Sequence, residues 1–496
     1  MNADTIRFVL DGELVEVGNP DPTRTVLQYL REDLRKIGTK EGCAEGDCGA
    51  CTVVIAEVDR SGKQLQVRAI NACIQFLPTL DGKELITVES LRRSDGSLHP
   101  VQQALVDCHG SQCGFCTPGF VMSLFALYKN NAEPTRREID DTLAGNLCRC
   151  TGYRPIIDAA EKMYRYRTAK DNWLEEPYAT KSGSREKEKI ALLKSAARPD
   201  MLAIDTGERK FFSPRNVGEF ATIFESNSDA VILAGGTDVG LWVTKQHKDL
   251  RTVIYTGNVE ELLALNVTKT HIDIGAAVSL SDAMLPLIEH YPEFEELFLR
   301  FASPPIRNAG TLGGNIANGS PIGDSMPALM VVDTTLVLRR GKQTREIPLN
   351  DFYLDYQKTA LEPGEFLERI LVPLRHDDIQ VQSYKVSKRF DQDISAICGA
   401  YALRRNGAGV ESIRIAYGGL AAVPKRAVTC EAELTGREWN EDAVQSGIEA
   451  LAADFSPISD MRSTADYRRR VCGNLLKRFY LDSSGSAQPR VYGYGR

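Results

Sequence analysis

Gly42-Cys-Ala-Glu-Gly-Asp-Cys-Gly-Ala-Cys51 is a short stretch in which three cysteines have the spacing Cys-x4-Cys-x2-Cys. Three thiolates on so short a loop can converge on a metal centre only if the backbone folds tightly around it. The glycines of the stretch permit this, because glycine reaches positive φ and lets other atoms approach the backbone closely. A fourth cysteine, Cys73, follows. The stretch therefore predicts a metal-binding loop with the ligands Cys43, Cys48, Cys51 and Cys73.

A second cysteine group lies in Gln112-Cys-Gly-Phe-Cys-Thr-Pro-Gly119 and Leu147-Cys-Arg-Cys-Thr-Gly-Tyr-Arg-Pro155. The spacing of the first group is that of plant-type [2Fe–2S] sites, which favours a cluster over a zinc knuckle or buried thiols. Two pairs of thiolates, as in the second group, can also hold tetrahedral zinc. Each pair lies beside an expected helix, whose N-terminal N–H groups favour a negatively charged cluster. Spacing alone leaves both metals open for Cys113, Cys116, Cys148 and Cys150.

The composition is that of a globular protein with several domains. At 496 residues the sequence exceeds the roughly 250–300 residues at which one hydrophobic core stops growing. A net charge of −7 without a long basic block argues against nucleic acid or a membrane as partner. No signal sequence or long apolar run is visible. The protein is expected in the cytoplasm, where metal binding explains twelve cysteines better than disulfides do.

Hydrophobic periodicity divides the sequence into successive domains. Alternating residues around Asp11-Gly12 predict a hairpin, helical spacing follows over residues 26–34, and residues 52–58 return to a strand. Residues 99–166 are helical in pattern, and a charged stretch after them is interpreted as a linker. Strands and helices alternate beyond residue 200. The predicted boundaries are 1–85, 86–167, 168–200 for the linker, 201–378 and 379–496.

Two glycine-rich loops lie in the predicted α/β domain. Leu233-Ala-Gly-Gly-Thr-Asp-Val-Gly240 closes a predicted strand, and Ala309-Gly-Thr-Leu-Gly-Gly-Asn-Ile316 forms a second turn. Loops of this kind present unshielded backbone N–H groups to a pyrophosphate. Neither loop has the G-x-G-x-x-G fingerprint of a Rossmann site, and each taken alone is more often an ordinary tight turn.

The order of these motifs resembles one family. Cys-Gly-x-Cys-Thr-Pro-Gly and Cys-Arg-Cys-Thr-Gly-Tyr, placed behind the first cysteine loop, are similar to the iron–sulfur domains of the xanthine dehydrogenase and aldehyde oxidase family of molybdenum hydroxylases. The glycine loops, with Pro321-Ile-Gly-Asp-Ser325, resemble its FAD-binding domain. The resemblance implies a multidomain α+β fold with a β-grasp ferredoxin-like domain, a helical [2Fe–2S] bundle, an α/β FAD-binding domain and a C-terminal α+β flavoprotein domain.

The resemblance also assigns cofactor contacts. Each cysteine group would hold one [2Fe–2S] cluster. FAD would contact Ile232, Leu233, Ala234, Gly235, Gly236, Thr237, Asp238, Val239, Phe301, Thr311, Leu312, Gly313, Gly314, Asn315, Asp324, Leu367 and Lys385. Gln112 would approach the pterin of a partner, with a helix cap as the plainer interpretation. Tyr356 would cover the flavin where NAD⁺ docks, with a core tyrosine as the alternative. Asp391 and Asp393 lie in the loop that helps to select the acceptor, and Phe390-Asp-Gln-Asp departs there from the family pattern.

The implied function is an electron relay. A molybdopterin-binding large subunit, absent from this sequence, would oxidise hypoxanthine or xanthine, and electrons would pass through the helical-domain cluster and then the ferredoxin-like cluster to FAD and NAD⁺. A dimer of such heterodimers is expected. No residue here is assigned to the hydroxylation itself. Two alternatives are the iron–sulfur/FAD subunit of a related aldehyde or N-heterocycle hydroxylase, and a non-enzymatic redox sensor or electron carrier. The sequence fixes neither the substrate nor the choice between NAD⁺ and oxygen.

Overall fold

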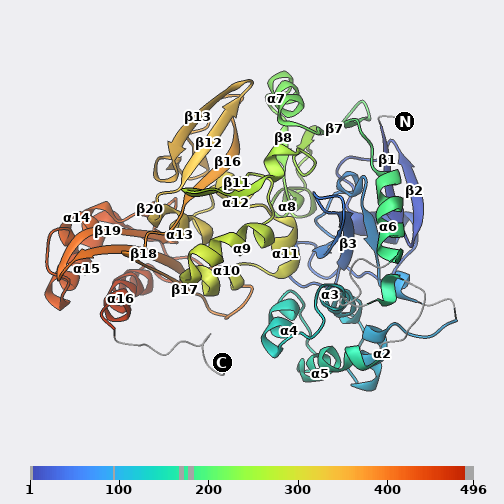
Figure 1. Cartoon of the computed structure of the whole chain (residues 1–496), viewed down its shortest axis with the longest axis horizontal. Coiled ribbons are helices and arrows are strands. Elements are labelled where there is room, and N and C mark those ends of the chain that lie inside the picture. Colours follow the sequence, from blue (N-terminus) through green and yellow to red (C-terminus); the bar gives the residue numbers. More distant parts are fainter. Residues whose placement is uncertain (1–3, 93–94, 167–172, 177–183, 486–496) are drawn as a thin grey trace. The chain divides into compact units, whose positions relative to one another are not determined.

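The computed structural model describes residues 4–92, 95–166, 173–176 and 184–485 (Figure 1). The chain forms two compact units, one made of Met1–Glu260 with Ser303–Gly310 and the other of Glu261–Ala302 with Thr311–Arg496. The boundary divides the predicted 201–378 domain, so the first glycine-rich loop lies in the first unit and residues 311–316 of the second loop lie in the second unit. Within the described ranges, no helix is long and apolar enough to cross a membrane.

The first unit begins with a five-stranded sheet in the order β2-β1-β5-β3-β4. Its strands are β1 (Thr5–Leu10), β2 (Glu13–Gly18), β3 (Thr52–Val58), β4 (Leu65–Asn71) and β5 (Glu84–Ile86). The predicted hairpin is confirmed, because Asp11 and Gly12 have φ of 55° and 85°, as a two-residue type I′ turn requires. The predicted helix is α1 (Val26–Gln28), which continues as a π-helical turn at Tyr29–Asp33. These elements form the predicted ferredoxin-like domain.

A helical bundle follows, as the periodicity predicted. Its helices are α2 (Pro100–Asp107), α3 (Thr117–Asn130), α4 (Arg136–Leu143) and α5 (Arg154–Lys162), which lie together in the teal part of Figure 1. α3 is the central helix, because it packs on β3 and β4 as well as on α2 and α4. Its side chains from Phe120 to Lys129 are therefore buried on every face. Cys116 is the N-cap of α3, so one predicted ligand stands at the start of the most buried helix.

The segment predicted as a linker contains a helix, α6 (Ser184–Ala196), in its described part. The apolar side chains that it buries are Ile190, Leu193 and Ala196. Glu186 accepts a hydrogen bond from the Leu65 amide at 3.1 Å, and Lys189 Nζ lies 2.7 Å from Glu84 Oε1. The linker interpretation is wrong for this part of the segment. The periodicity missed the helix because charged residues also face the protein, which removes the broad apolar stripe that marks an amphipathic helix.

The rest of the first unit is an α/β layer. Its sheet has the order β6-β7-β9-β8, with β6 (Leu202–Asp205), β7 (Lys210–Ser213), β8 (Val231–Leu233) and β9 (Thr252–Tyr255). Its helices are α7 (Val217–Ser226), α8 (Val239–Thr244) and α11 (Pro304–Ala309). β9 is parallel to both β7 and β8, in agreement with the predicted α/β character. Leu233 and Tyr255 share a hydrophobic core with Cys73 and Ile74, which joins this layer to the ferredoxin-like domain.

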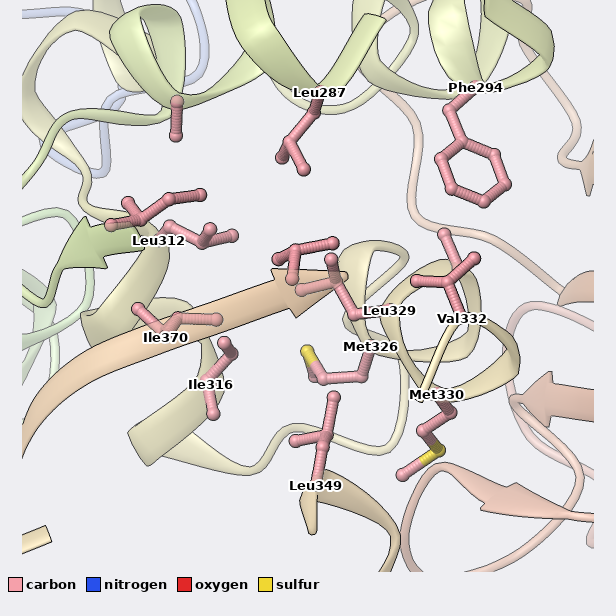
Figure 2. Close-up of a cluster of buried hydrophobic side chains, with 14 of the residues drawn as sticks. Leu287, Phe294, Leu312, Ile316, Met326, Leu329, Met330, Val332, Leu349 and Ile370 are labelled. Carbon is pink, nitrogen blue, oxygen red and sulfur yellow. The ribbon is translucent and has the colours of Figure 1, made fainter. Parts of the chain in front are cut away.

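The second unit contains an antiparallel sheet in the order β10-β11-β16-β12-β13. Its strands are β10 (Leu265–Val267), β11 (His271–Gly275), β12 (Thr335–Arg340), β13 (Gln343–Pro348) and β16 (Phe366–Pro373), beside a small hairpin of β14 (Tyr353–Asp355) and β15 (Lys358–Thr359). Its helices are α9 (Leu280–His290), α10 (Glu295–Leu299), α12 (Leu312–Asn318) and α13 (Ser325–Val331). Figure 2 shows the core between them, where Leu287, Leu312 and Ile370 project into the same space as Met326 and Leu329.

The C-terminal part of the second unit is a four-stranded sheet with helices. It contains β17 (Ile379–Val386), β18 (Ile397–Asn406), β19 (Gly409–Gly418), β20 (Lys425–Arg426), α14 (Val428–Leu434), α15 (Glu441–Asp454) and α16 (Ala465–Ser483). The predicted strands at 395–403 and 413–420 and helices at 442–453 and 465–479 are confirmed. Two buried tyrosines of its core have hydrogen-bond partners, because Tyr401 Oη donates to Tyr417 Oη at 2.8 Å and Tyr417 Oη donates to the Cys472 carbonyl at 2.9 Å.

Candidate cofactor sites

The four cysteines of the first group converge at one end of the ferredoxin-like sheet. Cys51 and Cys73 are buried, whereas Cys43 and Cys48 are half-buried on the loop before β3. Cys43 Sγ accepts hydrogen bonds from the backbone N–H groups of Glu45 at 3.5 Å and Cys48 at 3.4 Å. Hydrogen bonds from the Cys48 and Cys73 thiols and from these amides lower the pKa of Cys43, whereas the same contacts raise the pKa of the Cys48 and Cys73 thiols that donate them. The loop thus gives Cys43 two backbone donors, which stabilise its sulfur in the anionic form.

The loop is closed around this sulfur by its glycines. Gly46 and Gly49 have φ of 78° and 71°, which other residues rarely adopt. A Cβ on Gly42 would lie 2.8 Å from Cys48 Sγ. Backbone and sulfur therefore approach as closely as the sequence predicted. Residues of this kind fit a [2Fe–2S] cluster, whose sulfurs take hydrogen bonds from surrounding amides.

The second group converges between the bundle helices. Cys150 and Cys113 have their Sγ atoms 3.4 Å apart, and Cys148 Sγ lies 3.2 Å from Thr151 Oγ1. Burial, together with the neighbouring Cys148, raises the pKa of Cys116 to about 12. In the first group the thiols form a series in which Cys43 contacts Cys48 and Cys73, and Cys73 contacts Cys51. In the second group they form two pairs, Cys113 with Cys150 and Cys116 with Cys148. Among the described residues no three His, Cys, Asp or Glu side chains are arranged to hold a single metal ion. A [2Fe–2S] cluster takes four thiolates shared between two irons.

The two cysteine groups are joined by backbone contacts, which we name the cysteine-loop junction and which comprise residues 48–49, 119 and 145–147. The Leu147 amide donates to the Cys48 carbonyl at 3.0 Å. Buried Asn146 donates to the Gly49 carbonyl at 3.1 Å. A Cβ on Gly119 would lie 2.1 Å from the Gly49 carbonyl oxygen. Because Leu147 precedes Cys148, one hydrogen bond separates the polypeptide of one group from that of the other. The role of Asn146 and Gly119 in this junction was not predicted from the sequence.

Gln112 and the four cysteines outside the two groups differ in exposure. Gln112 is exposed beside the exposed Cys113. Cys108 is half-exposed in the bundle. The other three, Cys398, Cys430 and Cys472, are buried core residues. Burial raises the pKa of each of these three thiols, which makes them poor nucleophiles.

The first predicted flavin loop, residues 232–239, follows β8 and packs against the first cysteine group. A Cβ on Gly235 would lie 2.0 Å from the Ala309 carbonyl oxygen, so only glycine fits there. A Cβ on Gly240, in α8, would lie 2.5 Å from the carbonyl oxygen of Ile74, the residue after Cys73. Thr244 Oγ1 donates to the Ala44 carbonyl at 2.8 Å. The predicted flavin loop and α8 thus pack against Ile74 and Ala44, the sequence neighbours of Cys73 and Cys43, within the first unit.

The second predicted loop, residues 311–315, forms the N-terminus of α12 in the second unit. Thr311 is the N-cap, and its hydroxyl accepts from the Gly314 amide at 2.9 Å. A Cβ on Gly313 would lie 2.4 Å from the Ala276 carbonyl oxygen. Leu367 is buried on β16 and Phe301 is partly buried. The loop presents the N-terminal N–H groups of a helix, which suit a phosphate.

Asp324 and Lys385, both predicted flavin contacts, form a buried ion pair in the second unit. Lys385 Nζ lies 2.5 Å from Asp324 Oδ2, and each side chain is 2% exposed. Ser395 Oγ donates to Asp324 Oδ1 at 2.6 Å. Both carboxylate oxygens therefore already have a donor from the protein. The sequence did not predict this pairing.

The residues predicted around the acceptor lie on exposed loops. Tyr356 is 59% exposed at the turn between β14 and β15, so it is not the core tyrosine of the alternative interpretation. Asp393 accepts from the Arg389 amide at 2.8 Å. Although burial opposes it, this hydrogen bond and the nearby arginines lower the pKa of Asp393. Asp391 is exposed two residues earlier.

Models of four protein families match the chain. A "2Fe-2S iron-sulfur cluster binding domain" matches residues 8–77, a "[2Fe-2S] binding domain" matches 87–161, an "FAD binding domain in molybdopterin dehydrogenase" matches 206–375, and a "CO dehydrogenase flavoprotein C-terminal domain" matches 382–483. For the second cysteine group this favours a cluster over zinc. Two cluster-binding domains and an FAD-binding domain in one chain define an iron–sulfur flavoprotein.

Comparison with the sequences of known proteins assigns this iron–sulfur flavoprotein to a family. The chain is 33% identical to xanthine dehydrogenase of Emericella nidulans over 98% of this chain and 39% of that protein, and 31% identical to xanthine dehydrogenase/oxidase of Gallus gallus over 96% and 40%. It thus spans about two fifths of the length of these relatives. The chain belongs to the molybdenum hydroxylase family, as an iron–sulfur and FAD-binding chain.

Solved structures support the same fold. The carbon monoxide dehydrogenase structure from Hydrogenophaga pseudoflava is 28% identical with a TM-score of 0.53, and the match covers 56% of this chain and 98% of that chain. Quinoline 2-oxidoreductase from Pseudomonas putida 86 is 21% identical with a TM-score of 0.51, over 55% of this chain and 96% of that one. At that identity the second likeness shows the fold alone.

Proposed function

We propose that this chain carries electrons from a molybdenum centre on a partner chain, through two [2Fe–2S] clusters, to FAD and then to NAD⁺ during the oxidation of hypoxanthine or xanthine. The observation that carries the proposal is a continuous series of contacts within the first unit. Cys148 adjoins Leu147, Leu147 donates to Cys48, and the helix after the predicted flavin loop packs on Ile74 beside Cys73. Contacts of this kind keep the two cysteine groups and the predicted flavin loop close together, as a relay of single electrons requires.

The proposed ligands of the ferredoxin-domain cluster are Cys43, Cys48, Cys51 and Cys73. Those of the helical-domain cluster are Cys113, Cys116, Cys148 and Cys150. When bound, the clusters would exchange one electron at a time and the flavin would collect electrons in pairs. The chain's own part is to donate backbone N–H groups to Cys43, to fix the two groups against each other through the cysteine-loop junction, and to bury Cys51 and Cys73 away from water.

The proposed FAD contacts are the two glycine loops with Phe301, Asp324, Leu367 and Lys385. The N–H groups at the start of α12 would bind phosphate, because a helix N-terminus carries a partial positive charge. The close packing of Gly235 and Gly313 leaves backbone rather than side chains to line the loops. The Asp324–Lys385 pair would place one fixed cation and one fixed acceptor beside the ligand.

Xanthine enters the proposal through the names of the relatives in Emericella nidulans and Gallus gallus. NAD⁺ enters it as the acceptor that the family resemblance of the sequence implies. The matched domains occupy most of residues 8–483 and are described as cluster-binding, FAD-binding and flavoprotein domains. We propose that the molybdopterin-binding domain belongs to a separate large subunit, approached by Gln112, in a dimer of heterodimers. Because the solved neighbour at 28% identity is by its name a carbon monoxide dehydrogenase, a hydroxylase of another small substrate is the second candidate.

Metal analysis tests the relay. The purified chain is expected to contain iron and acid-labile sulfide at about four each per chain, because each of two [2Fe–2S] sites binds two of both. FAD should be released by acid at about one per chain. Zinc at comparable stoichiometry would contradict the ligand assignment. A chain with both clusters and no flavin would instead support the simple electron carrier.

Tyr356→Ala tests the proposed acceptor site. If the exposed ring stacks on nicotinamide, its removal deletes a contact worth roughly 0.5–1.5 kcal/mol, and the KM for NAD⁺ should rise several-fold to about tenfold. Flavin content and turnover with an artificial acceptor should stay near normal. Leu354→Ala is the matched control, because Leu354 is also 59% exposed on the same hairpin. An unchanged KM in Tyr356→Ala, or equal effects of both variants, would remove Tyr356 from the acceptor site.

A further inference from the structure

We propose that Asn71 is a positioning residue that raises the reduction potential of the ferredoxin-domain site by donating its side-chain amide N–H to the thiolate of Cys51. Asn71 Nδ2 lies 3.7 Å from Cys51 Sγ, within hydrogen-bonding range for sulfur. The inference rests on the proposed role of Cys51 as a cluster ligand. It adds a side-chain donor to the backbone donors that the loop supplies to Cys43.

The fold places this amide beside the sulfur. Asn71 is the last residue of β4 and pairs with Thr52, the first residue of β3, directly after Cys51. The next residue, Ala72, donates its amide to the Cys51 carbonyl at 3.2 Å. Two backbone contacts therefore hold the strand end on which Asn71 lies against Cys51. Cys73 follows two residues later, so Asn71 stands between the two buried ligands of the group.

The burial of Asn71 is unexplained by stability alone. Asn71 is 3% exposed, and its Oδ1 is buried with no hydrogen-bond partner among the described residues. A buried acceptor without a hydrogen bond is destabilising, so an apolar side chain of the same size would be the more stable choice. What the amide offers instead is its N–H toward the sulfur. A ligand thiolate only accepts hydrogen bonds, which fixes the amide with nitrogen and not oxygen on that side.

The direction of the change in reduction potential follows from the negative charge on the ligand sulfurs. When the site gains one electron, without a proton, negative charge on the ligand sulfurs increases. A donated N–H stabilises the more negative state more strongly, so it raises the potential, and hydrogen bonds to the sulfurs are a known determinant of cluster potential. Cys51 is 1% exposed, and in so dry an environment a dipole is little screened. The helical-domain group has a separate side-chain contact, Thr151 Oγ1 on Cys148.

The test is an EPR-monitored redox titration of the full chain with both clusters. Asn71→Leu keeps the size of the side chain and removes the N–H. In this variant we expect the equilibrium constant for one-electron reduction of the ferredoxin-domain cluster to fall about tenfold. That change lowers the reduction potential of a one-electron couple by about 59 mV. Only one of the two cluster signals should shift, while iron and labile sulfide stay at the wild-type count. Asn71→Asp, which has the same shape but adds negative charge near the sulfur, should shift the same signal further in the same direction.

Two variants serve as controls. Asn308→Leu removes an amide that donates to the Ala69 carbonyl on the same strand, and it should shift neither signal. Thr151→Val should shift only the other signal. Unchanged potentials in both Asn71 variants with full iron content would overturn the inference, as would loss of the cluster in both, since Asn71 would then be a structural residue. A wild-type chain that binds no iron would contradict the proposed function instead.

Discussion

Cys48→Ser is expected to abolish one of the two cluster EPR signals and to lower the iron content from about four to about two per chain. Serine keeps the size of the side chain but is a much poorer iron ligand than a thiolate. Cys48 is one of four thiols that converge in the first group, so no spare ligand is available there. Cys116→Ser should remove the other signal for the same reason. Iron analysis and low-temperature EPR of the reduced protein measure both effects.

Cys108→Ser is the matched control for these substitutions. Cys108 lies in the helical bundle near Cys113 but outside both converging groups, and its replacement should leave both signals and the iron content unchanged. If either ligand variant loses both signals in a folded protein, the two groups are not separate sites. If Cys108→Ser loses a signal, the ligand assignment of the second group is wrong.

Asp324→Ala is expected to destabilise the second unit by about 3–5 kcal/mol, because it leaves the Lys385 ammonium buried without a counter-charge. For a unit of this size that corresponds to a fall in Tm of roughly 6–20 °C. FAD occupancy should fall as well. Substrate oxidation with an artificial acceptor that takes electrons before the flavin should survive in the assembled enzyme. Differential scanning calorimetry and flavin quantitation measure these effects.

The double variant Asp324→Ala with Lys385→Met separates charge from ligand binding. Replacing both charges by apolar groups should restore much of the stability that the single variant loses. FAD occupancy should remain low, because neither proposed polar contact is restored. Ser395→Ala, which removes only the hydroxyl donor to Asp324, should cost about 1 kcal/mol. A double variant with normal FAD content would assign the pair to folding alone.

Short-range patterns predicted most of the fold and the candidate ligands. The Asp11-Gly12 turn and the cysteine loops depend on residues close together in the sequence, and their backbone requirements are visible in glycine positions. The two glycine loops were also identifiable, because packing against Ala309 and Ala276 leaves no room for a side chain. Each of these features is determined locally, which is why spacing was sufficient.

Long-range contacts were not predictable in the same way. Asn146 donates to the Gly49 carbonyl, 97 residues away in the sequence, and Lys385 on β17 pairs with Asp324 at the start of α13. Neither contact leaves a periodic signal. α6 was missed because it buries Glu186 and Lys189 beside its apolar residues. Most of the features that residue spacing did not predict therefore involve buried polar residues. The partners of these residues are distant in the sequence.

Because of the cysteine-loop junction, the two iron–sulfur domains can be exchanged between proteins only as a pair. Because Gly119 admits the Gly49 carbonyl and the Leu147 amide binds that of Cys48, the fit is between two main chains, not between exchangeable side chains. The first cysteine loop of a ferredoxin-like domain taken from another protein would not fit against this helical domain unless residues 119 and 145–147 were transferred as well. Chimeras of this family should therefore be cut after the helical bundle and not between the two domains.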